Sequence, residues 1–344
     1  MANLLWLQGG ACSGNTMSFL NAEEPTAVDL VTDFGVNILW HPSLGLELGI
    51  DLQTMLWECL LGKKPLDILV FEGTVIQAPN GTGEWNRFAE RPMKDWLSDL
   101  AHVANFVVAV GDCACWGGIP AMAPNPSDST GLQFLRRQEG GFLGKDFRAK
   151  SGLPVINIPG CPAHPDWITQ ILVAIATGRI GDIVLDDLHR PQTFFNTFTQ
   201  TGCTRNIHFA YKASTTEFGQ RKGCLFYDIG CRGPMTHSSC NRILWNRVSS
   251  KTRAGVPCLG CTEPEFPFYD LKPGTVFKTH VICMLWYSED KSLQWLKPLL
   301  QAAFIVHLRL LSNLQRSCAG LACIAATFSH HAKYIILLLK HNIS

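Results

Sequence analysis

The chain has 344 residues, which is enough for one large or two ordinary domains with a substantial hydrophobic core. Its formal net charge of +1 and its 17% of charged residues exclude the strongly basic composition expected of a protein that binds nucleic acid. Hydrophobic residues make up 47% of the chain, and the ten Trp and nineteen Phe favour a sizeable buried interface with another subunit.

Continuous apolar runs in the first half of the chain predict buried strands, because parallel strands are covered on both faces. These runs are Asn3 to Gln8, Val36 to Trp40, Leu66 to Gly73, Asn105 to Asp112 and Leu153 to Gly160. Helix-like segments lie between or after them, at Thr16 to Leu20, Leu52 to Leu61, Asn86 to His102 and Asp166 to Thr177. The alternation predicts an α/β fold with a doubly wound parallel sheet over residues 1–180.

Cysteine follows three of the predicted strands. Cys12 comes after the first strand, Cys113 after the fourth and Cys161 after the fifth. Ligands of open α/β sheets bind beyond the carboxyl ends of the strands, where residues distant in sequence meet. We therefore expect these three thiols to share one ligand.

A second concentration of cysteine begins where the strand–helix alternation fades, near residue 180. Six of the fourteen cysteines lie between residues 203 and 261, and Gly or Pro directly precedes most of them, which is typical of loops. We expect a loop-rich domain stabilised by its ligands, with two further sets of thiols. One set is Cys203, Cys224 and Cys231, and the other is Cys240, Cys258 and Cys261.

Three thiols in each set leave two kinds of metal site open. Structural zinc sites are closed and four-coordinate, and no histidine stands at zinc-finger spacing, so three incomplete zinc sites would be unusual. All-thiolate sites suit iron–sulfur clusters, and several clusters in one chain indicate a path for electrons. We favour iron–sulfur clusters and keep a zinc-binding scaffold without a redox role as the alternative.

The N-terminal sequence MANLLWLQGGACSGN contains neither the basic segment nor the long apolar run of an export signal. In the reducing cytoplasm, clustered cysteines bind metal more often than they form disulfides. We therefore expect a cytoplasmic protein. The alternative is a protein that contacts a membrane surface through its apolar C-terminal tail. The tail is not expected to span the membrane, because no apolar run in it reaches the roughly 20 residues of a membrane span.

Seven stretches of the sequence together identify a family. They read WLQGGACSGN, LVFEGTV, VGDCACWGGIPAMAPNP, VINIPGCPAHPDW, LDDLHRP, CLFYDIGCRGPMTHSSC and PCLGCTEPEFP. In this order and spacing the chain resembles the small, electron-transferring subunit of nickel–iron hydrogenases, closest to the cyanobacterial uptake type. The likeness extends from the N-terminus to about residue 280.

The resemblance implies a flavodoxin-like domain with a proximal cluster over residues 1–180, and a domain with a medial and a distal cluster over residues 181–282. Residues 283–344 form a divergent tail of unknown role. About three clusters, of the [4Fe–4S] or [3Fe–4S] type, would carry electrons from H2 oxidation in a separate large subunit. That partner alone would hold the nickel–iron centre, so no catalytic residue is expected here. The acceptor would be a protein or a quinone-linked membrane partner, and the alternative role is a hydrogen-sensing regulatory hydrogenase.

The resemblance also assigns the cysteine ligands. The proximal set is Cys12, Cys113 and Cys161, the medial set is Cys240, Cys258 and Cys261, and the distal set is Cys203, Cys224 and Cys231. The family's fourth proximal cysteine is replaced by Asn15, so that either Asn15 or Cys115 could complete the site. Gln200 stands where the family usually has a distal histidine, and the medial set fits a three-iron cluster.

Glu72 ends the third predicted strand and points to the same crevice as Cys12. A glutamate in this position could carry protons or form a hydrogen bond near the proximal cluster. A role in capping a helix or loop is equally open.

Overall fold

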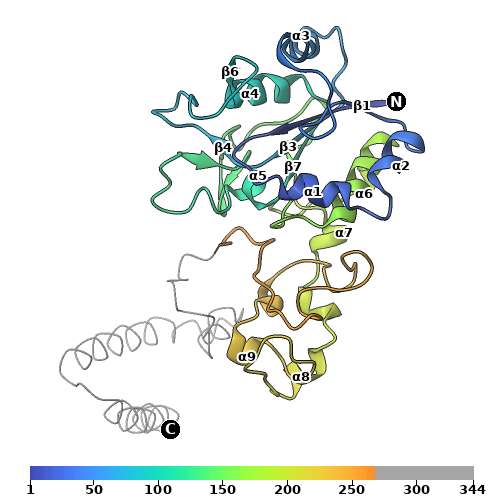
Figure 1. The fold of residues 1–344 in the computed structure, drawn as a ribbon, viewed down its shortest axis with the longest axis vertical. Helices are drawn as coiled ribbons and strands as arrows, with labels where there is room; N and C mark the ends of the chain where they lie inside the picture. The colour runs from blue at the N-terminus through green and yellow to red at the C-terminus, as the bar shows by residue number, and fades with distance from the viewer. Residues whose placement is uncertain (268–344) are drawn as a thin grey trace, which may run out of the picture. The chain divides into compact units, whose positions relative to one another are not determined.

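The computed structural model describes residues 1–267, and a five-stranded parallel sheet organises their N-terminal part (Figure 1). The strands are β1 (Ala2–Gln8), β2 (Val36–Trp40), β3 (Ile68–Glu72), β7 (Phe106–Val110) and β11 (Ile156–Ile158). Their order across the sheet is β11-β7-β3-β1-β2, which is the flavodoxin-like order with its switch point between β1 and β3. This confirms the predicted doubly wound sheet, and every strand overlaps a predicted run.

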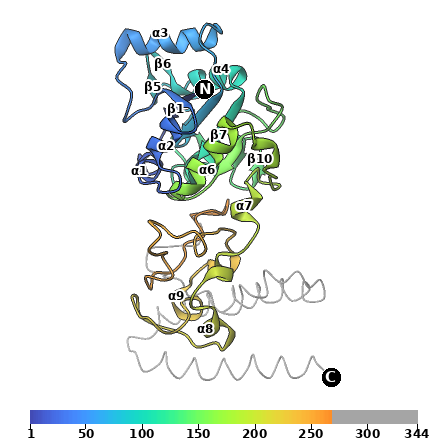
Figure 2. The same cartoon turned by 90° about the vertical axis from the view of Figure 1, so that its right-hand side faces the viewer.

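Helices cover both faces of the sheet (Figure 2). Alternate strand residues point to opposite faces, as in β1, where Leu5 and Leu7 join one apolar cluster and Leu4 and Trp6 join the other. The first cluster includes α3 (Gly49–Leu60), α4 (Met93–Val103) and α5 (Asp112–Trp116). The second includes α1 (Gly14–Leu20), α2 (Ala27–Thr32) and α6 (Pro165–Ala176). Because both faces are buried, only the strand ends are left for a ligand.

The helix predicted over Asn86 to His102 is only partly correct. Two short strands, β5 (Arg87–Phe88) and β6 (Arg91–Pro92), pair antiparallel before α4 begins at Met93. The turn between them places Ala89 and Glu90 at positive φ, which is incompatible with a right-handed helix. Pro92 also disfavours helical backbone at the residue before it, so the helix can start only after the proline.

Short strands and loops complete the sheet domain. β4 (Val75–Ile76) pairs with β8 (Ser129–Thr130), and β9 (Phe134–Leu135) pairs with β10 (Gln138–Glu139).

The following part has only short helical segments, which confirms the predicted loop-rich domain. They are η1 (Ile180–Asp182), α7 (Gln192–Phe195), η2 (Thr199–Gly202), α8 (Asn206–Ala210), α9 (Phe226–Ile229) and η3 (Gly233–Met235). None of the helices in residues 1–267 has the length and apolar character needed to cross a membrane. The tail predicted at residues 283–344 lies outside the described residues.

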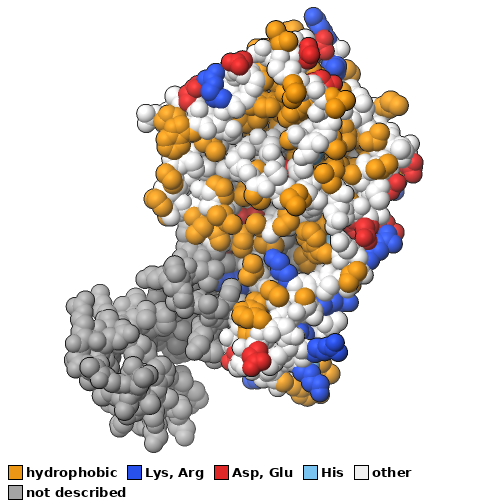
Figure 3. Space-filling view, viewed as in Figure 1, with side chains coloured by type: hydrophobic (Ala, Val, Ile, Leu, Met, Phe, Trp, Pro, Cys, Tyr) orange, Lys and Arg blue, Asp and Glu red, His pale blue; other side chains and the backbone are white. Residues whose placement is uncertain are grey.

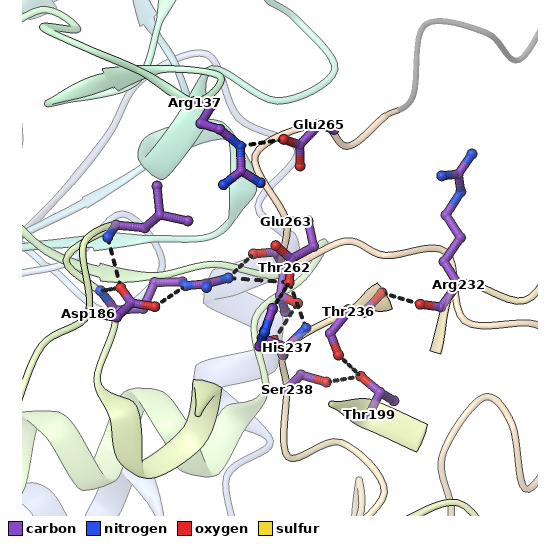
Figure 4. Close-up of polar contacts among 12 residues, drawn as sticks. Arg137, Asp186, Thr199, Arg232, Thr236, His237, Ser238, Thr262, Glu263 and Glu265 are labelled. Carbon is purple, nitrogen blue, oxygen red and sulfur yellow. Dashed lines mark hydrogen bonds and ion pairs between the residues drawn. The ribbon is translucent and has the colours of Figure 1, made fainter. Parts of the chain in front are cut away.

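A buried polar network joins the loop that follows Cys261 to the segment that follows α6, which packs against the sheet domain. The Arg190 guanidinium bonds to the Asp186 carboxylate at 2.8 Å, approaches Glu263 at 3.5 Å and donates to the carbonyl of Thr262 at 3.1 Å. Glu263 in turn accepts the backbone N–H of His237 at 2.6 Å. Figure 4 shows Asp186, Thr262, Glu263 and His237 gathered at this junction. The network holds the loop that follows Cys261 against the segment between η1 and α7.

Candidate metal centres

The proximal set meets at the carboxyl edge of the sheet, as expected. Cys12 lies in the loop between β1 and α1, Cys113 lies in α5 directly after β7, and Cys161 lies in the loop after β11. The thiols are close enough to influence one another. Burial, followed by the charges of Asp112, Cys161 and Cys12, raises the pKa of Cys113 to about 12. A Cβ atom at Gly118 would stand 2.7 Å from the Cys113 sulfur, so glycine is needed at this close approach.

Glu72 is fully buried at the switch point of the sheet and caps helix α1. Its carboxylate accepts the backbone N–H groups of Asn15 at 2.9 Å and Thr16 at 3.2 Å, and it also accepts the Thr16 hydroxyl and the Trp6 indole N–H. A carboxylate stabilises the first turn of a helix because it pairs with unsatisfied N–H groups and with the helix dipole. Glu72 therefore has the geometry of a cap, one of the two roles that the sequence left open.

Asn15 connects two of the loops that carry proximal cysteines. Its side-chain oxygen accepts the backbone N–H of Ala163, two residues after Cys161, at 2.8 Å. Its amide also fills the space in front of Gly111, where a Cβ atom would stand 2.2 Å from the Asn15 nitrogen. The side-chain oxygen considered as a metal ligand is thus engaged in holding the Cys161 loop to α1.

The other candidate for a fourth proximal ligand, Cys115, belongs to the apolar core. It is fully buried in the cluster beneath α5, and its thiol donates to the carbonyl of Ala109 at 3.5 Å.

Sequence reasoning missed Asp112, which precedes Cys113 and is 2% exposed. Neither carboxylate oxygen has a hydrogen-bond partner among the described residues, and burial raises the pKa of Asp112 well above its ordinary value, opposed by the charge of Arg136. An acidic residue at the end of an apolar strand was the signal available in the sequence.

The distal set lines one pocket in the loop-rich part, together with Gln200. Each sulfur accepts a backbone N–H from the residue two positions later, at 3.4 Å in all three cases: Arg205 to Cys203, Phe226 to Cys224 and Gly233 to Cys231. Such bonds stabilise the negative charge of a thiolate and tune the potential of a cluster. Gln200 donates from its side chain to Asn206 at 3.0 Å.

The medial set lines a cavity of about 690 Å³. Burial raises the pKa of Cys240 to about 12 and that of Cys258 to about 11, and the charge of Cys261 acts in the same direction on both. Lys251 lines the same cavity, and its positive charge lowers the pKa of these thiols. Sequence reasoning missed this lysine, because nothing in a loop sequence indicates which way its charge faces.

The three sets form a series. Cys161 of the proximal set lies near the medial set, since it lines the same cavity as Cys240, Cys258 and Cys261. Cys258 of the medial set donates its backbone N–H to the sulfur of Cys231 in the distal set, at 3.2 Å. The order through the molecule is therefore proximal, medial and distal.

The donor chemistry of these sites fits iron–sulfur clusters. Each set offers three thiols, and the distal sulfurs already accept backbone N–H groups, as cluster ligands do. Within residues 1–267, no group of three or more His, Cys, Asp or Glu side chains is arranged to hold a single metal ion.

Two known protein families match parts of the chain. Residues 12–175 match a family described as "NADH ubiquinone oxidoreductase, 20 Kd subunit". Residues 195–271 match the family that describes the C-terminal part of the NiFe/NiFeSe hydrogenase small subunit.

Individual relatives cover most of the chain. The F420 non-reducing hydrogenase II small subunit of Methanosarcina mazei is 34% identical over 285 residues, which are 77% of this chain and 73% of that protein. The periplasmic [NiFe] hydrogenase small subunit of Solidesulfovibrio fructosivorans is 29% identical over 78% of this chain and 81% of that protein. Among solved structures, the actinobacterial-type NiFe-hydrogenase of Ralstonia eutropha H16 has a TM-score of 0.72 at 28% identity, covering 93% of this chain and 92% of that one.

Proposed function

We propose a specific role for this chain from the premise that it belongs to the family of nickel–iron hydrogenase small subunits. As a subunit of this enzyme class it serves iron–sulfur electron transfer, and its partner is a hydrogenase large subunit. The proposal is that it serves hydrogen uptake: H2 is oxidised in the large subunit, and this chain conducts the electrons to an acceptor. The cyanobacterial uptake type is the finer assignment, and the seven sequence stretches are its support.

The observation that carries the proposal is the series of three thiol sets. Iron–sulfur clusters accept and release single electrons, and the three sets supply positions for them one after another. Cys12, Cys113 and Cys161 would hold the proximal cluster, Cys240, Cys258 and Cys261 the medial one, and Cys203, Cys224 and Cys231 the distal one. The candidates for a fourth ligand are Asn15 or Cys115 in the proximal site and Gln200 in the distal one.

The protein's own groups position these ligands. Glu72 and Asn15 fix the loops of the proximal thiols, and the Arg190–Glu263 contact fixes the loop after Cys261. Family membership favours clusters over a zinc scaffold. A reducing, cytoplasmic compartment, in which clustered thiols bind metal, is part of the proposal.

The test is metal and turnover analysis of the heterodimer, purified without oxygen. We expect about ten to eleven iron atoms and about twelve sulfide atoms in each small subunit, as three [4Fe–4S] or [3Fe–4S] clusters require, together with rapid H2-dependent reduction of a viologen dye. Electron paramagnetic resonance of the oxidised protein should show a three-iron signal that Cys240→Ser abolishes and Cys59→Ser leaves intact. Zinc without sulfide would refute the proposal. Slow turnover with a bound regulatory kinase would replace uptake by hydrogen sensing.

A further inference from the structure

The two parts of the chain differ in the sign of their charge. Residues 1–195 carry 12 Lys and Arg against 21 Asp and Glu, whereas residues 196–267 carry nine against four. The near-neutral total therefore hides a basic region that coincides with the part holding the medial and distal thiols. Figure 3 shows Lys and Arg side chains spread over this part, with few acidic ones among them.

Three of these cations lie close to Cys224, a member of the distal set, through backbone pairing or sequence position. Cys224 donates its N–H to the carbonyl of Ala213 at 2.7 Å, which places Lys212 one residue from this bond. Arg221 and Lys222 immediately precede the Gly223–Cys224 pair. All three side chains are exposed, and none takes part in an ion pair recorded among residues 1–267. Their charges therefore face solvent close to the last thiols of the series.

A buried arginine makes this arrangement rigid. Arg205 is 4% exposed, and its guanidinium donates to the carbonyls of Gly223 at 2.8 Å and Thr252 at 2.7 Å. It also donates to the carbonyl of Gln220. The segment that carries Arg221 and Lys222 is thus held in place by a buried side chain, whose guanidinium is bonded to backbone carbonyls and does not face solvent. A preorganised surface loses less entropy on binding.

Large apolar side chains stand among these cations. Ile207, Tyr211 and Phe218 are 61%, 80% and 60% exposed. Exposed aromatic and apolar side chains interleaved with basic ones are typical of a protein-binding surface, in which aromatics and Arg are enriched. Glu217 is the acidic residue in this segment, and Gln220 donates to its carboxylate at 2.9 Å.

We propose that this exit surface, made by Ile207, Tyr211, Lys212, Phe218, Arg221 and Lys222, is the docking site for a small acidic redox protein. The inference rests on the proposed function and adds the charge and class of the electron acceptor. Opposite charge steers such a partner to the distal thiols and raises its association rate by about 10- to 1,000-fold at low salt. The apolar side chains among the cations then exclude water from the contact. A bilayer is less well matched, because the apolar residues are interleaved with the cations and do not form one long face.

The test uses the heterodimer with three charges reversed, Lys212→Glu, Arg221→Glu and Lys222→Glu. The matched control reverses three exposed lysines of the sheet domain, Lys63→Glu, Lys145→Glu and Lys150→Glu, which changes the net charge equally. The probe is an acidic [2Fe–2S] ferredoxin, and the readouts are its Kd from anaerobic interferometry and its rate of H2-dependent reduction. Turnover with methyl viologen, a small dication, reports on the rest of the enzyme.

We expect the wild-type Kd to weaken at least tenfold between 20 and 200 mM salt, as screening of exposed charges requires. The exit-surface variant should bind at least tenfold more weakly at 20 mM salt and reduce ferredoxin correspondingly more slowly, with viologen turnover not reduced, while the control behaves as wild type. Equal ferredoxin binding by the two variants would overturn the proposal. Binding of wild type to phosphatidylserine vesicles but not to ferredoxin would also overturn it and assign the surface to a membrane. If the wild-type heterodimer did not reduce methyl viologen with H2 at all, this result would instead count against the proposed function.

Discussion

Replacing Arg190 with methionine should destabilise the protein more than any exposed arginine can. The side chains of Arg190 and Glu263 are both 5% exposed, so the substitution leaves Glu263 buried with only His237 as a partner. It also removes the bond to Asp186 and the donor to Thr262, and it removes a cation that lies 5.5 Å from the centre of the Phe195 ring. Breaking a buried pair by removing one partner costs about 3–5 kcal/mol.

The matched control is Arg87→Met. Arg87 also pairs with a carboxylate, that of Glu84, but the two side chains are 48% and 47% exposed. Exposed pairs contribute about 0–1 kcal/mol, because water screens them. Thermal unfolding followed by circular dichroism should therefore separate the two variants clearly. At about 2–4 °C per kcal/mol for a domain of this size, Arg190→Met should lower the midpoint by at least about 6 °C.

A double variant tests the cause. Adding Glu263→Gln to Arg190→Met removes the buried charge that the single substitution leaves without its partner. The double variant should therefore lose less unfolding free energy than the two single variants lose in total. Equal shifts for Arg190→Met and Arg87→Met would refute the reasoning, and so would simple additivity in the double variant. In either case the junction would be held by packing and not by this network.

Three further predictions concern other sites. Gly111→Ala should reduce the iron content by about one cluster, because a Cβ atom at this position would stand 2.2 Å from the Asn15 side chain. The control is Gly178→Ala, which is also at positive φ but has no atom within 4 Å of the new Cβ, and it should leave the iron content unchanged. Glu72→Ala should lower the unfolding free energy by about 1–3 kcal/mol, since two buried N–H groups lose their acceptor, while Glu72→Gln should lose less in the same melt. Burial lowers the pKa of His41 to about 4, so between pH 6.5 and pH 4 the unfolded chain takes up a proton that the folded protein does not. The unfolding free energy should therefore fall by up to about 1.4 kcal/mol for each pH unit in this range. His41→Phe should flatten this dependence in thermal melts at acid pH.

The strands and cysteines were predictable because each leaves a local signal. Buried parallel strands are continuous apolar runs, and the topology of such a sheet brings Cys12, Cys113 and Cys161 to one edge whatever lies between them. The prediction that the helix begins at Asn86 was wrong for an equally local reason, since the turn at Ala89 and Glu90 overrides helix propensity before Met93. Residues whose role depends on distant partners were out of reach. Nothing near Arg190 in the sequence points to Glu263, 73 positions away.

Asn15 illustrates the limit in the other direction. Its place in the motif suggested a substitute metal ligand, but the structure shows its oxygen bonded to the backbone of Ala163 and its amide packed on Gly111. A short polar side chain in a ligand position has thus gained a scaffolding role that the motif cannot express. Asn15→Ala would therefore loosen the Cys161 loop even if Asn15 never contacts iron.

The loop-rich part raises a question of what makes it fold. Among residues 1–267, the buried members of its own apolar cluster are Leu225, Phe226 and Ile229, together with Cys224 and Cys231, two of the proposed distal ligands. Part of the core is therefore also part of the distal site. A core this small cannot offset the conformational entropy of so many loop residues. We expect ligand binding to supply part of the difference, as it does in other small metal-bound domains. We therefore expect folding of residues 196–267 to be coupled to assembly of their proposed clusters, while the polar junction at Arg190 links this part to the segment that packs on the sheet domain.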